Sequence, residues 1–287
     1  MKSGSLFADR TVVIATMHKK EQVISPILGR ELGVKVIVPS DFDTDKFGTF
    51  TREIKRLGTQ IEAAKIKAEQ ALNITGETLA IASEGTFGPH PFVPYLSCNR
   101  EIVMLLDKKH DIKIIGEEFS TETNHSHQAV KSVEEAFAFA QKVGFPEHGL
   151  VVMFEETPKD SSQVIKGITT QEKLEEAVSL FFKKSPNGKV HLETDMRALY
   201  NPTRMKNIAK ATLNLVEKLN SLCPNCDFPG FSITDRKPGL PCALCNMPSQ
   251  LTLVNIYQCQ KCGFQKEILF PDGIKQVDPS QCMYCNP

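Results

Sequence analysis

The cysteines are the residues whose type and spacing point most directly to chemistry. Eight of the nine form four Cys-x-x-Cys pairs near the end of the chain: Cys223/Cys226, Cys242/Cys245, Cys259/Cys262 and Cys282/Cys285. Such a pair places two thiolates on one metal ion at about 2.3 Å, and two pairs complete a tetrahedron. The sequence therefore predicts two zinc ions. Both should be structural, because sulfur fills every ligand position.

A disulfide framework is the alternative use of so many cysteines. Disulfides need an oxidising compartment, and the first ten residues lack the apolar segment of a secretory signal. We therefore expect zinc and a cytoplasmic location. Strands are expected at 250–257 and 263–270, on either side of the third pair. Two pairings remain possible: first with second and third with fourth, or first with third and second with fourth.

Composition limits the classes of function. The chain has 287 residues, 41% of them hydrophobic, and no apolar run near the length of a membrane span. We expect a globular protein with no membrane partner. Its 34 basic and 34 acidic residues give a formal net charge of zero. No overall field therefore favours nucleic acid or a membrane surface.

Short runs rich in Val and Ile alternate with segments of helical period. This alternation predicts an α/β layered fold. The expected strands are 11–16, 34–38, 79–83, 101–106, 112–115 and 150–154, and the expected helices are 20–32, 60–73, 131–142, 171–183 and 202–222. The last helix should open at Asn201-Pro202, a cap followed by proline in the first helical position.

The turn at 14–21 follows a predicted buried strand and leads into a predicted helix. Such a turn directs backbone N–H groups and the positive helix end at whatever lies above the sheet, which suits a phosphate group. Lys20 or its neighbour Lys19 would add a point charge. The alternative is a solvated first turn with two ordinary lysines.

Acidic residues alternate in the segment that follows the second predicted strand: Asp41, Asp43 and Asp45, with Glu53 further on. Carboxylates near a phosphate-binding turn are the usual ligands of magnesium, so this segment predicts a Mg²⁺ or Mn²⁺ site. The alternative is an acidic loop that caps a helix beginning near Thr51.

Glu84 comes directly after the predicted strand 79–83. In an open α/β sheet, ligands bind beyond the carboxyl ends of the strands, so Glu84 is well placed to hold a metal or activate water. Gly85 would let the backbone approach a ligand closely. A structural turn is the alternative.

Two arginines lie near the start of the last predicted helix. Arg197 and Arg204 would grip a phosphate or a base, and Asp195 would orient one of them. An Asp–Arg pair that joins the α/β domain to the cysteine-rich region fits the sequence equally well.

These motifs together resemble a widespread bacterial family known only as a domain of unknown function. The resemblance covers nearly the whole chain. It is carried by IATMHKKE at 14–21, FGTFTRE at 47–53, ASEGTFGPHP at 82–91, TDMRA at 194–198, NPTRM at 201–205 and the eight cysteines. The resemblance implies no activity.

The first part of the chain is also similar to the inosine triphosphatase-like nucleoside triphosphate pyrophosphatases, which hydrolyse non-standard nucleotides with Mg²⁺. Thr16 and Lys20 resemble the turn after their first strand. The spacing of Asp45 and Thr49 resembles their acid-x-x-x-Thr-Phe motif. The segment 62–68, which contains Lys67, matches their Glu-x-Ala-x-x-Lys-Ala helix, and Glu84-Gly85 resembles the acidic end of their next strand.

This resemblance implies a mixed-sheet layered domain over 1–220. The cysteine spacing predicts a zinc-ribbon or knuckle module over 221–287. The resemblance also implies a pyrophosphatase-like hydrolase in which Lys20, Asp45 and Glu84 are catalytic. Lys20 and Arg204 would hold phosphates, and Asp45 and Glu84 a magnesium ion. The other expected substrate-binding residues are Thr16, His18, Thr49, Lys67, Gly85, His90 and Arg197.

The sequence departs from that enzyme pattern in three places. The predicted helix follows the Thr-Phe element later in the chain than it does in those enzymes. His18 stands where such enzymes commonly have asparagine, and their Asp-Asp-Ser-Gly-Leu string becomes SEGTF at 83–87. The alternative function is therefore a non-catalytic zinc-ribbon protein that binds a ligand or a nucleic acid. Lys261 and Phe264 would make the contacts to a nucleic acid.

Overall fold

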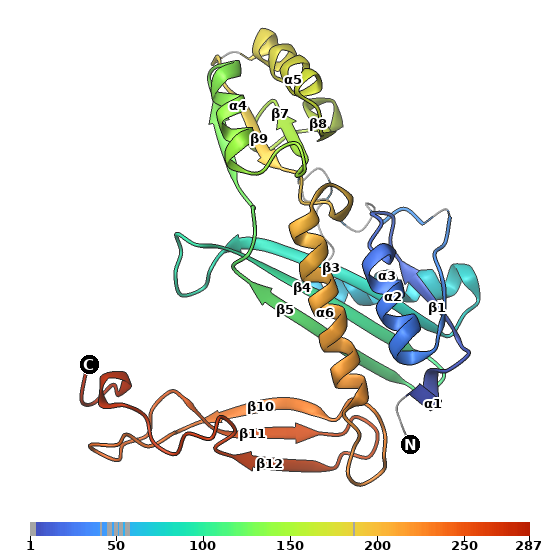
Figure 1. Cartoon of the computed structure of the whole chain (residues 1–287), viewed down its shortest axis with the longest axis vertical. Helices are drawn as coiled ribbons and strands as arrows, with labels where there is room; N and C mark the ends of the chain where they lie inside the picture. Colours follow the sequence, from blue (N-terminus) through green and yellow to red (C-terminus); the bar gives the residue numbers. More distant parts are fainter. Residues whose placement is uncertain are drawn as a thin grey trace. The chain divides into compact units, whose positions relative to one another are not determined.

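The computed structural model describes residues 4–40, 42–44, 48, 51, 54, 58–185 and 187–287. The chain divides into two compact units. The first unit is Phe7–Val216, and the second is Glu217–Pro287 together with the chain up to Leu6. The division falls inside a single helix, α6 (Pro202–Asn220) (Figure 1).

The first unit is built on a five-stranded sheet in the order β2-β1-β3-β4-β5. The strands are β1 (Thr11–Ala15), β2 (Lys35–Ile37), β3 (Leu79–Pro89), β4 (Ser97–Asp107) and β5 (Ile112–Ser120). β1 pairs in parallel with both β2 and β3, whereas β3, β4 and β5 are antiparallel neighbours. The predicted α/β fold with a mixed sheet is therefore confirmed.

Strand β3 is longer than the sequence predicts. Instead of ending at residue 83, it continues to Pro89 and pairs with β4 along its whole length. The polar residue Glu84 therefore lies within the strand, opposite Ile102. The extension is possible because the antiparallel partner β4 satisfies the backbone along one edge. β1 ends at Ala15, opposite Ala82, so β1 does not cover the other edge of β3 beyond that point.

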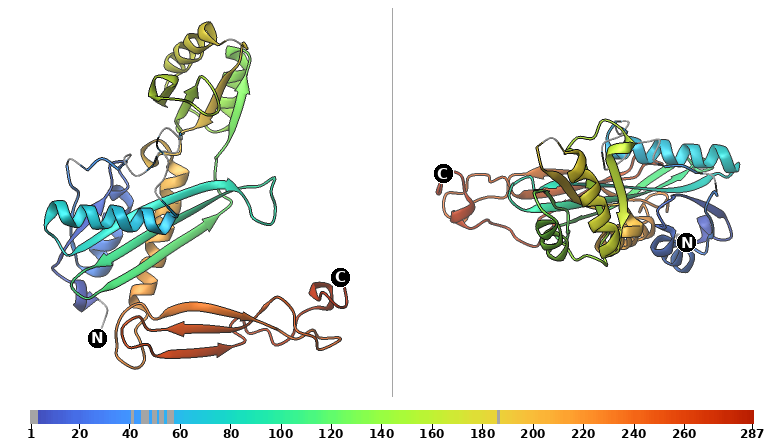
Figure 2. Two further views of the ribbon diagram at one scale, coloured as in Figure 1. Left: turned by 180° about the vertical axis from the view of Figure 1, so that it is seen from behind. Right: turned by 90° about the horizontal axis from the view of Figure 1, so that it is seen from above.

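Helices cover both faces of this sheet, as the view in Figure 1 and the view from behind in Figure 2 show. Helix α3 (Gln60–Thr75) packs its small residues Ala64, Ala68 and Ala71 against one face. It begins with a capping box between Thr59 and Glu62. Helix α2 (Glu21–Leu32) follows β1, and the short helix α1 (Gly4–Phe7) precedes it.

Helix α6 lies against the other face. It begins at Pro202, as predicted, and the side chain of Asn201 accepts a hydrogen bond from the backbone N–H of Arg204. A Cβ atom on Gly116 of β5 would lie 2.3 Å from both the backbone oxygen of Ala211 and the backbone nitrogen of Leu215. The helix backbone therefore rests directly on the sheet at this glycine.

A second, antiparallel sheet completes the first unit, in the order β6-β9-β7-β8. The strands are β6 (His127–Val130), β7 (Leu150–Met153), β8 (Val164–Ile168) and β9 (Val190–Thr194). Helices α4 (Val133–Lys142) and α5 (Gln171–Lys184) pack on it through one apolar core. The sequence analysis missed β6, β8 and β9, because each is short and carries polar or charged residues.

The second unit contains the three-stranded antiparallel sheet β10-β11-β12. Its strands are β10 (Ser232–Pro238), β11 (Thr252–Gln258) and β12 (Gln265–Leu269). The predicted hairpin around the third cysteine pair is confirmed, since β11 and β12 are antiparallel neighbours on either side of it. In the described part of the chain, three short 3-10 helices lie in loops: Ser161–Gln163, Ala198–Tyr200 and Pro279–Gln281. None of the helices among the described residues is long and apolar enough to cross a membrane.

Replacing Gly116 by alanine should destabilise the protein, because the new methyl group would meet helix backbone rather than a movable side chain. We expect a loss of about 1–3 kcal/mol in the free energy of unfolding, the usual cost of overpacking. Gly29→Ala is the matched control. It lies within α2 with no atom near its Cβ position, so alanine should stabilise by about 0.5–1 kcal/mol. Denaturant unfolding followed by circular dichroism measures both. Equal stabilities for Gly116→Ala and the unchanged protein would contradict the packing described.

Candidate functional site

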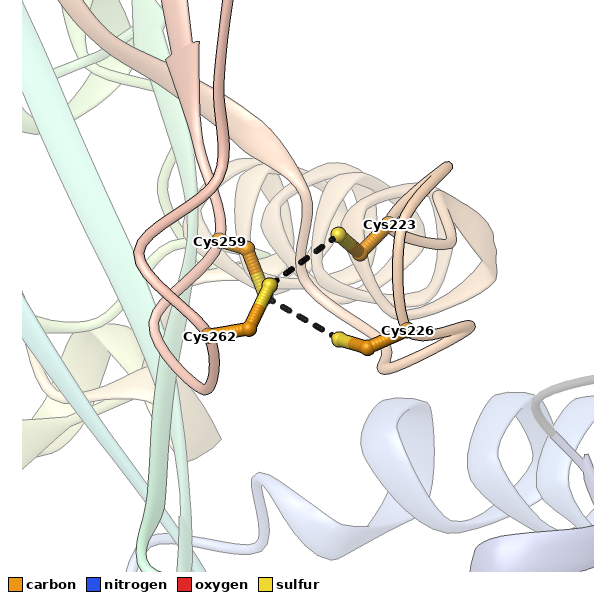
Figure 3. A group of neighbouring side chains, drawn as sticks. All are labelled: Cys223, Cys226, Cys259 and Cys262. Carbon is orange, nitrogen blue, oxygen red and sulfur yellow. Dashed lines mark hydrogen bonds between the residues drawn. The ribbon is translucent and has the colours of Figure 1, made fainter.

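The eight paired cysteines form two groups of four. Cys223 and Cys226 meet Cys259 and Cys262 (Figure 3). The second group is Cys242, Cys245, Cys282 and Cys285. The structure thus chooses between the two pairings that the sequence left open: the first pair joins the third, and the second joins the fourth. The two groups lie at opposite ends of the three-stranded sheet, because the third pair follows β11 and the second pair precedes it.

The sulfur geometry in both groups suits a tetrahedral metal ion. Within each group all sulfurs lie within 4.8 Å of one another. The closest pairs are 3.7 Å apart in the first group, and 3.6 and 3.9 Å apart in the second. A zinc ion with four sulfurs at 2.3 Å requires an edge of about 3.8 Å. A disulfide would require about 2.05 Å. Both groups therefore can hold a metal ion, consistent with two zinc sites.

The backbone around the first three pairs has a common conformation. The residue after the second cysteine, Asp227, Asn246 or Gly263, has a positive φ of 55°, 61° or 72°. Its N–H donates to the carbonyl of the first cysteine in the pair. Asp, Asn and Gly adopt this left-handed conformation most readily. Their position directly after each pair was a sequence signal for this turn that the sequence analysis missed.

The thiols influence one another's protonation. The backbone N–H of Phe264 and the side-chain amide of Asn225 lower the pKa of Cys262 to about 6. Backbone N–H groups lower the pKa of Cys242 to about 7. Burial raises the pKa of Cys226 to about 12, and the hydrogen bond with Cys245 raises that of Cys285 to about 12. Four thiolates this close need a cation to compensate their charge, which zinc would supply.

The first unit contains a cavity of about 290 Å³ at the end of β1. It lies where β3 continues beyond Ala82, the residue opposite the end of β1. Seven of the predicted site residues line it: Thr16, His18, Lys20, Lys67, Glu84, Arg197 and Arg204. The structure therefore brings together residues that are up to 188 positions apart in the chain.

Lys20 is almost fully buried in the wall of this cavity. Its ammonium group donates hydrogen bonds of 3.0 Å to the carbonyl and the hydroxyl oxygen of Ser83. Burial, and then the nearby guanidinium of Arg204, lower the pKa of Lys20 to about 7, while Glu84 acts in the opposite direction. A negatively charged group in the cavity would favour the charged form of this side chain.

Glu84 and Lys67 form a buried ion pair. Glu84 comes from β3 and Lys67 from α3. The side chain of Gln60 donates to the backbone oxygens of Glu84 and Arg100, at 2.7 and 2.8 Å, and so ties α3 to this part of the hairpin. The carboxylate of Glu84 is thus already partnered by a cation.

Arg204 is paired with Glu101, a buried acid on β4 that the sequence analysis missed. Its Nε donates to Glu101 Oε1 at 2.8 Å, and its Nη1 donates to the backbone oxygen of Met196. Asn99 donates to the same carboxylate at 3.0 Å. A side chain on Gly85 would collide with both members of the pair. Gly85 therefore gives room to an ion pair and is not among the residues that line the cavity.

The second sheet supplies the opposite wall. Val151 and Glu193 are paired across β7 and β9, and both line the cavity with Lys166. Asp195 accepts hydrogen bonds from the guanidinium and the backbone N–H of Arg197 and from the backbone N–H of Gly167. The sequence analysis expected Asp195 to orient an arginine, and Arg197 is the one that it contacts.

Another predicted site residue, His90, is not part of the cavity lining, and two others fall outside the described residues. His90 sits in the turn after β3, where its ring packs edge-on against Phe119. Asp45 and Thr49, together with Asp41 and Glu53, lie outside the described residues. Among the described residues, only the two cysteine groups gather three or more side chains that could hold a metal ion.

The charge of the cavity favours an anionic ligand. Among its described lining residues, five are basic: Lys20, Lys67, Lys166, Arg197 and Arg204. Three are acidic: Glu84, Glu193 and Asp195. Lysine and arginine in a partly closed cavity attract phosphate or carboxylate groups more strongly than they do in bulk water.

Comparison with known families gives one match. The sequence model of DUF6671, a domain of unknown function, matches residues 67–287. The matched part contains Lys67, Glu84, both arginines and all eight paired cysteines, whereas Thr16, His18 and Lys20 precede it. No curated protein matches the chain.

The grouping of the Cys-x-x-Cys pairs can be tested by replacing two pairs at a time with serine. The unchanged protein should contain two zinc ions per chain. A variant with serine at Cys223, Cys226, Cys259 and Cys262 should keep one ion, because it loses a single site. A variant with serine at Cys223, Cys226, Cys242 and Cys245 should keep none, because it breaks both. Elemental analysis of protein purified without chelator measures the content. The opposite order of metal contents would contradict the pairing.

The charge of Lys20 should control anion binding. Sulfate is a suitable probe, because it remains a dianion above pH 7. Above a pKa of about 7 the ammonium form is lost, so sulfate affinity should fall about tenfold for each pH unit between 7.5 and 9.5. Titration calorimetry measures this slope. Lys20→Met should bind more weakly and with no slope, whereas the exposed neighbour variant Lys19→Met should keep the slope. A flat profile for the unchanged protein would contradict this role.

Proposed function

Because the chain belongs to DUF6671, a family with no assigned function, we propose its activity from the cavity itself. The first unit binds phosphorylated small molecules, nucleotides among them, and hydrolyses them with Mg²⁺ or Mn²⁺. The second unit is a zinc-binding domain in which the eight cysteines hold two structural ions. We place the protein in the cytoplasm, where thiols stay reduced.

The observation that carries this proposal is the gathering of five basic side chains around one small cavity. Two features make the cavity suitable for phosphate. It lies beyond the end of a parallel strand, where ligands of α/β sheets usually bind. It also holds Lys20 in a buried position where an entering anion would favour the charged form of the lysine.

The contact between Lys67 and Glu84 also supports a pyrophosphatase-like reaction. The resemblance to the inosine triphosphatase-like enzymes singled out both residues, on motifs of α3 and β3, and they form one ion pair at the cavity. The lysine that follows β1 lies in the wall of the same cavity. We therefore retain the mixed-sheet relationship to those enzymes as part of the proposal.

The roles follow from position and charge. Lys20 in its ammonium form and Arg204 hold the phosphates, with Thr16 and His18 lining the same turn. Arg197 acts from the opposite wall, oriented by Asp195.

Glu84 orients the attacking water. Glu84 and Asp45, the latter outside the described residues, would hold the magnesium ion, which when bound neutralises phosphate oxygens.

A turnover screen tests this proposal. Purified protein with Mg²⁺ or Mn²⁺ should release pyrophosphate or phosphate from at least one member of a panel of standard and modified nucleoside triphosphates. Glu84→Gln should lower kcat/KM by at least about 100-fold, the usual cost of losing an acid–base or metal-holding group. Glu69→Gln, an exposed change on α3, should not lower it. Undiminished activity in Glu84→Gln would reject this site.

Nucleic-acid binding by the second unit is the other candidate. Lys261 lies 5.5 Å from the ring centre of Phe228, and Phe264 is partly exposed beside Phe231. Such rings can stack on bases. Residues 217–287, however, contain six basic and six acidic residues, which weakens non-specific binding. Retention on single-stranded DNA or RNA, with no turnover across the nucleotide panel, would favour this candidate.

A further inference from the structure

Two adjacent lysines after β1 have opposite surroundings. Lys19 is exposed, with a positive φ of 58°, whereas Lys20 is buried in the cavity wall. The left-handed residue turns the chain so that the next side chain points inward. Burying a lysine costs free energy unless its charge is compensated or lost. A lysine at this buried position therefore indicates a functional role for its side chain.

Neither hydrogen-bond partner that Lys20 contacts carries a negative charge. Both of its hydrogen bonds go to oxygens of one residue, the carbonyl and the hydroxyl of Ser83. A neutral amine has two N–H groups and one lone pair. When both N–H groups donate to Ser83, the lone pair lies on the side away from Ser83. Ser83 thus fixes the direction of the nitrogen without supplying the negative charge that would stabilise an ammonium ion.

The surrounding charges reinforce this state. Arg204 and Lys67 disfavour a positive charge on Lys20, while Glu84 and Glu101 favour it. Each of these acids is already paired with a cation, Glu84 with Lys67 and Glu101 with Arg204. An ordinary lysine at pH 7 is a free amine in only about one molecule in 2,500. With a pKa of about 7, Lys20 is a free amine in about half of the molecules.

We propose that Lys20 is a nucleophilic amine that forms an imine with a phosphorylated aldehyde or ketone bound in the cavity. A lysine beside another cation and shielded from water is the arrangement that activates an amine for this chemistry. The proposal rests on the proposed function for the phosphate of the ligand only. Lys166, Arg197 and Arg204 hold that phosphate when Lys20 reacts with the carbonyl carbon. The imine itself does not require hydrolysis of a phosphate.

The reaction balances without another reactant. The nitrogen lone pair attacks the carbonyl carbon, a C–N bond forms, and the carbon–oxygen double bond becomes single. Both protons of the amine then pass to that oxygen, which leaves as water, and a C=N bond remains. Thr16 and His18 line the same cavity, and the proposal assigns the transfer of these protons to them.

Reductive trapping tests the proposal. The full protein is incubated at pH 7 with glycolaldehyde phosphate and cyanoborohydride, which reduces an imine to a stable amine. Peptide mass spectrometry then gives the labelling rate of each lysine. Lys20 should react at least tenfold faster than Lys19 or any other lysine. Labelling of Lys20 no faster than Lys19 in the unchanged protein would overturn the proposal.

Three variants and one further probe sharpen the test. Lys20→Arg should lose the fast label, and Lys19→Arg should keep it. Ser83→Ala should slow the labelling of Lys20 several-fold, because the amine loses one of its two hydrogen-bond acceptors.

Glycolaldehyde without phosphate separates the two proposals. If it labels Lys20 as fast as the phosphorylated probe, the imine stands and phosphate binding fails. If nucleotides are hydrolysed but Lys20 is not labelled selectively, the imine fails alone.

Discussion

The buried ion pair between Arg204 and Glu101 is the interaction on which the rest of the first unit depends. It joins the first turn of α6 to the middle of the five-stranded sheet, and Arg204 also holds the backbone of Met196 just after β9. Removing one partner of such a pair typically costs about 3–5 kcal/mol, because the other charge is left buried. The pair therefore fixes the segment that joins the two sheets.

The neighbours of this ion pair show how strictly it constrains the fold. Gly85 can have no side chain, because a Cβ would lie 2.5 Å from Glu101 and 2.6 Å from Arg204. Asn99 donates to the carboxylate, and Asn207 of α6 donates to Asn99 at 3.0 Å. The ring of Phe87 lies 5.3 Å from the guanidinium carbon. A buried charge pair is stable only when its remaining polar atoms are satisfied in this way.

The same ion pair sets the electrostatics of the cavity. Arg204 is a fixed positive charge near Lys20, and burial next to it lowers the pKa of that lysine to about 7. A cavity with a permanently charged arginine and a lysine near its titration point can respond to both phosphate and carbonyl groups. The two proposals for this site differ in which protonation state of Lys20 they use.

The second unit depends on a different constraint. Its buried clusters are small, and the cysteines themselves are members: Cys223 and Cys259 in one cluster, Cys242 and Cys282 in the other. A unit with so little apolar core gains limited stability from burial. Metal binding would then supply much of the folding free energy, at both ends of a single three-stranded sheet.

Local sequence patterns predict several elements of this protein correctly. Val- and Ile-rich runs predicted the strands of the mixed sheet, because apolar periodicity reports burial directly. The Cys-x-x-Cys spacing predicted two four-sulfur groups, since local geometry places both thiols of a pair together. Asn201-Pro202 predicted the start of α6 for the same local reason.

Other features depend on contacts between residues that are far apart in the chain. Which cysteine pairs meet depends on the β11–β12 hairpin and the chain that precedes β10, and spacing does not encode it. Glu101 has no distinguishing sequence signal, because a single acid in an apolar strand becomes an ion-pair partner only when Arg204 arrives from a helix 103 residues away. The burial of Lys20 beside an exposed Lys19 depends on a backbone angle and a distant arginine. Contacts between residues far apart in the chain produce no repeating sequence pattern, so the sequence alone does not reveal them.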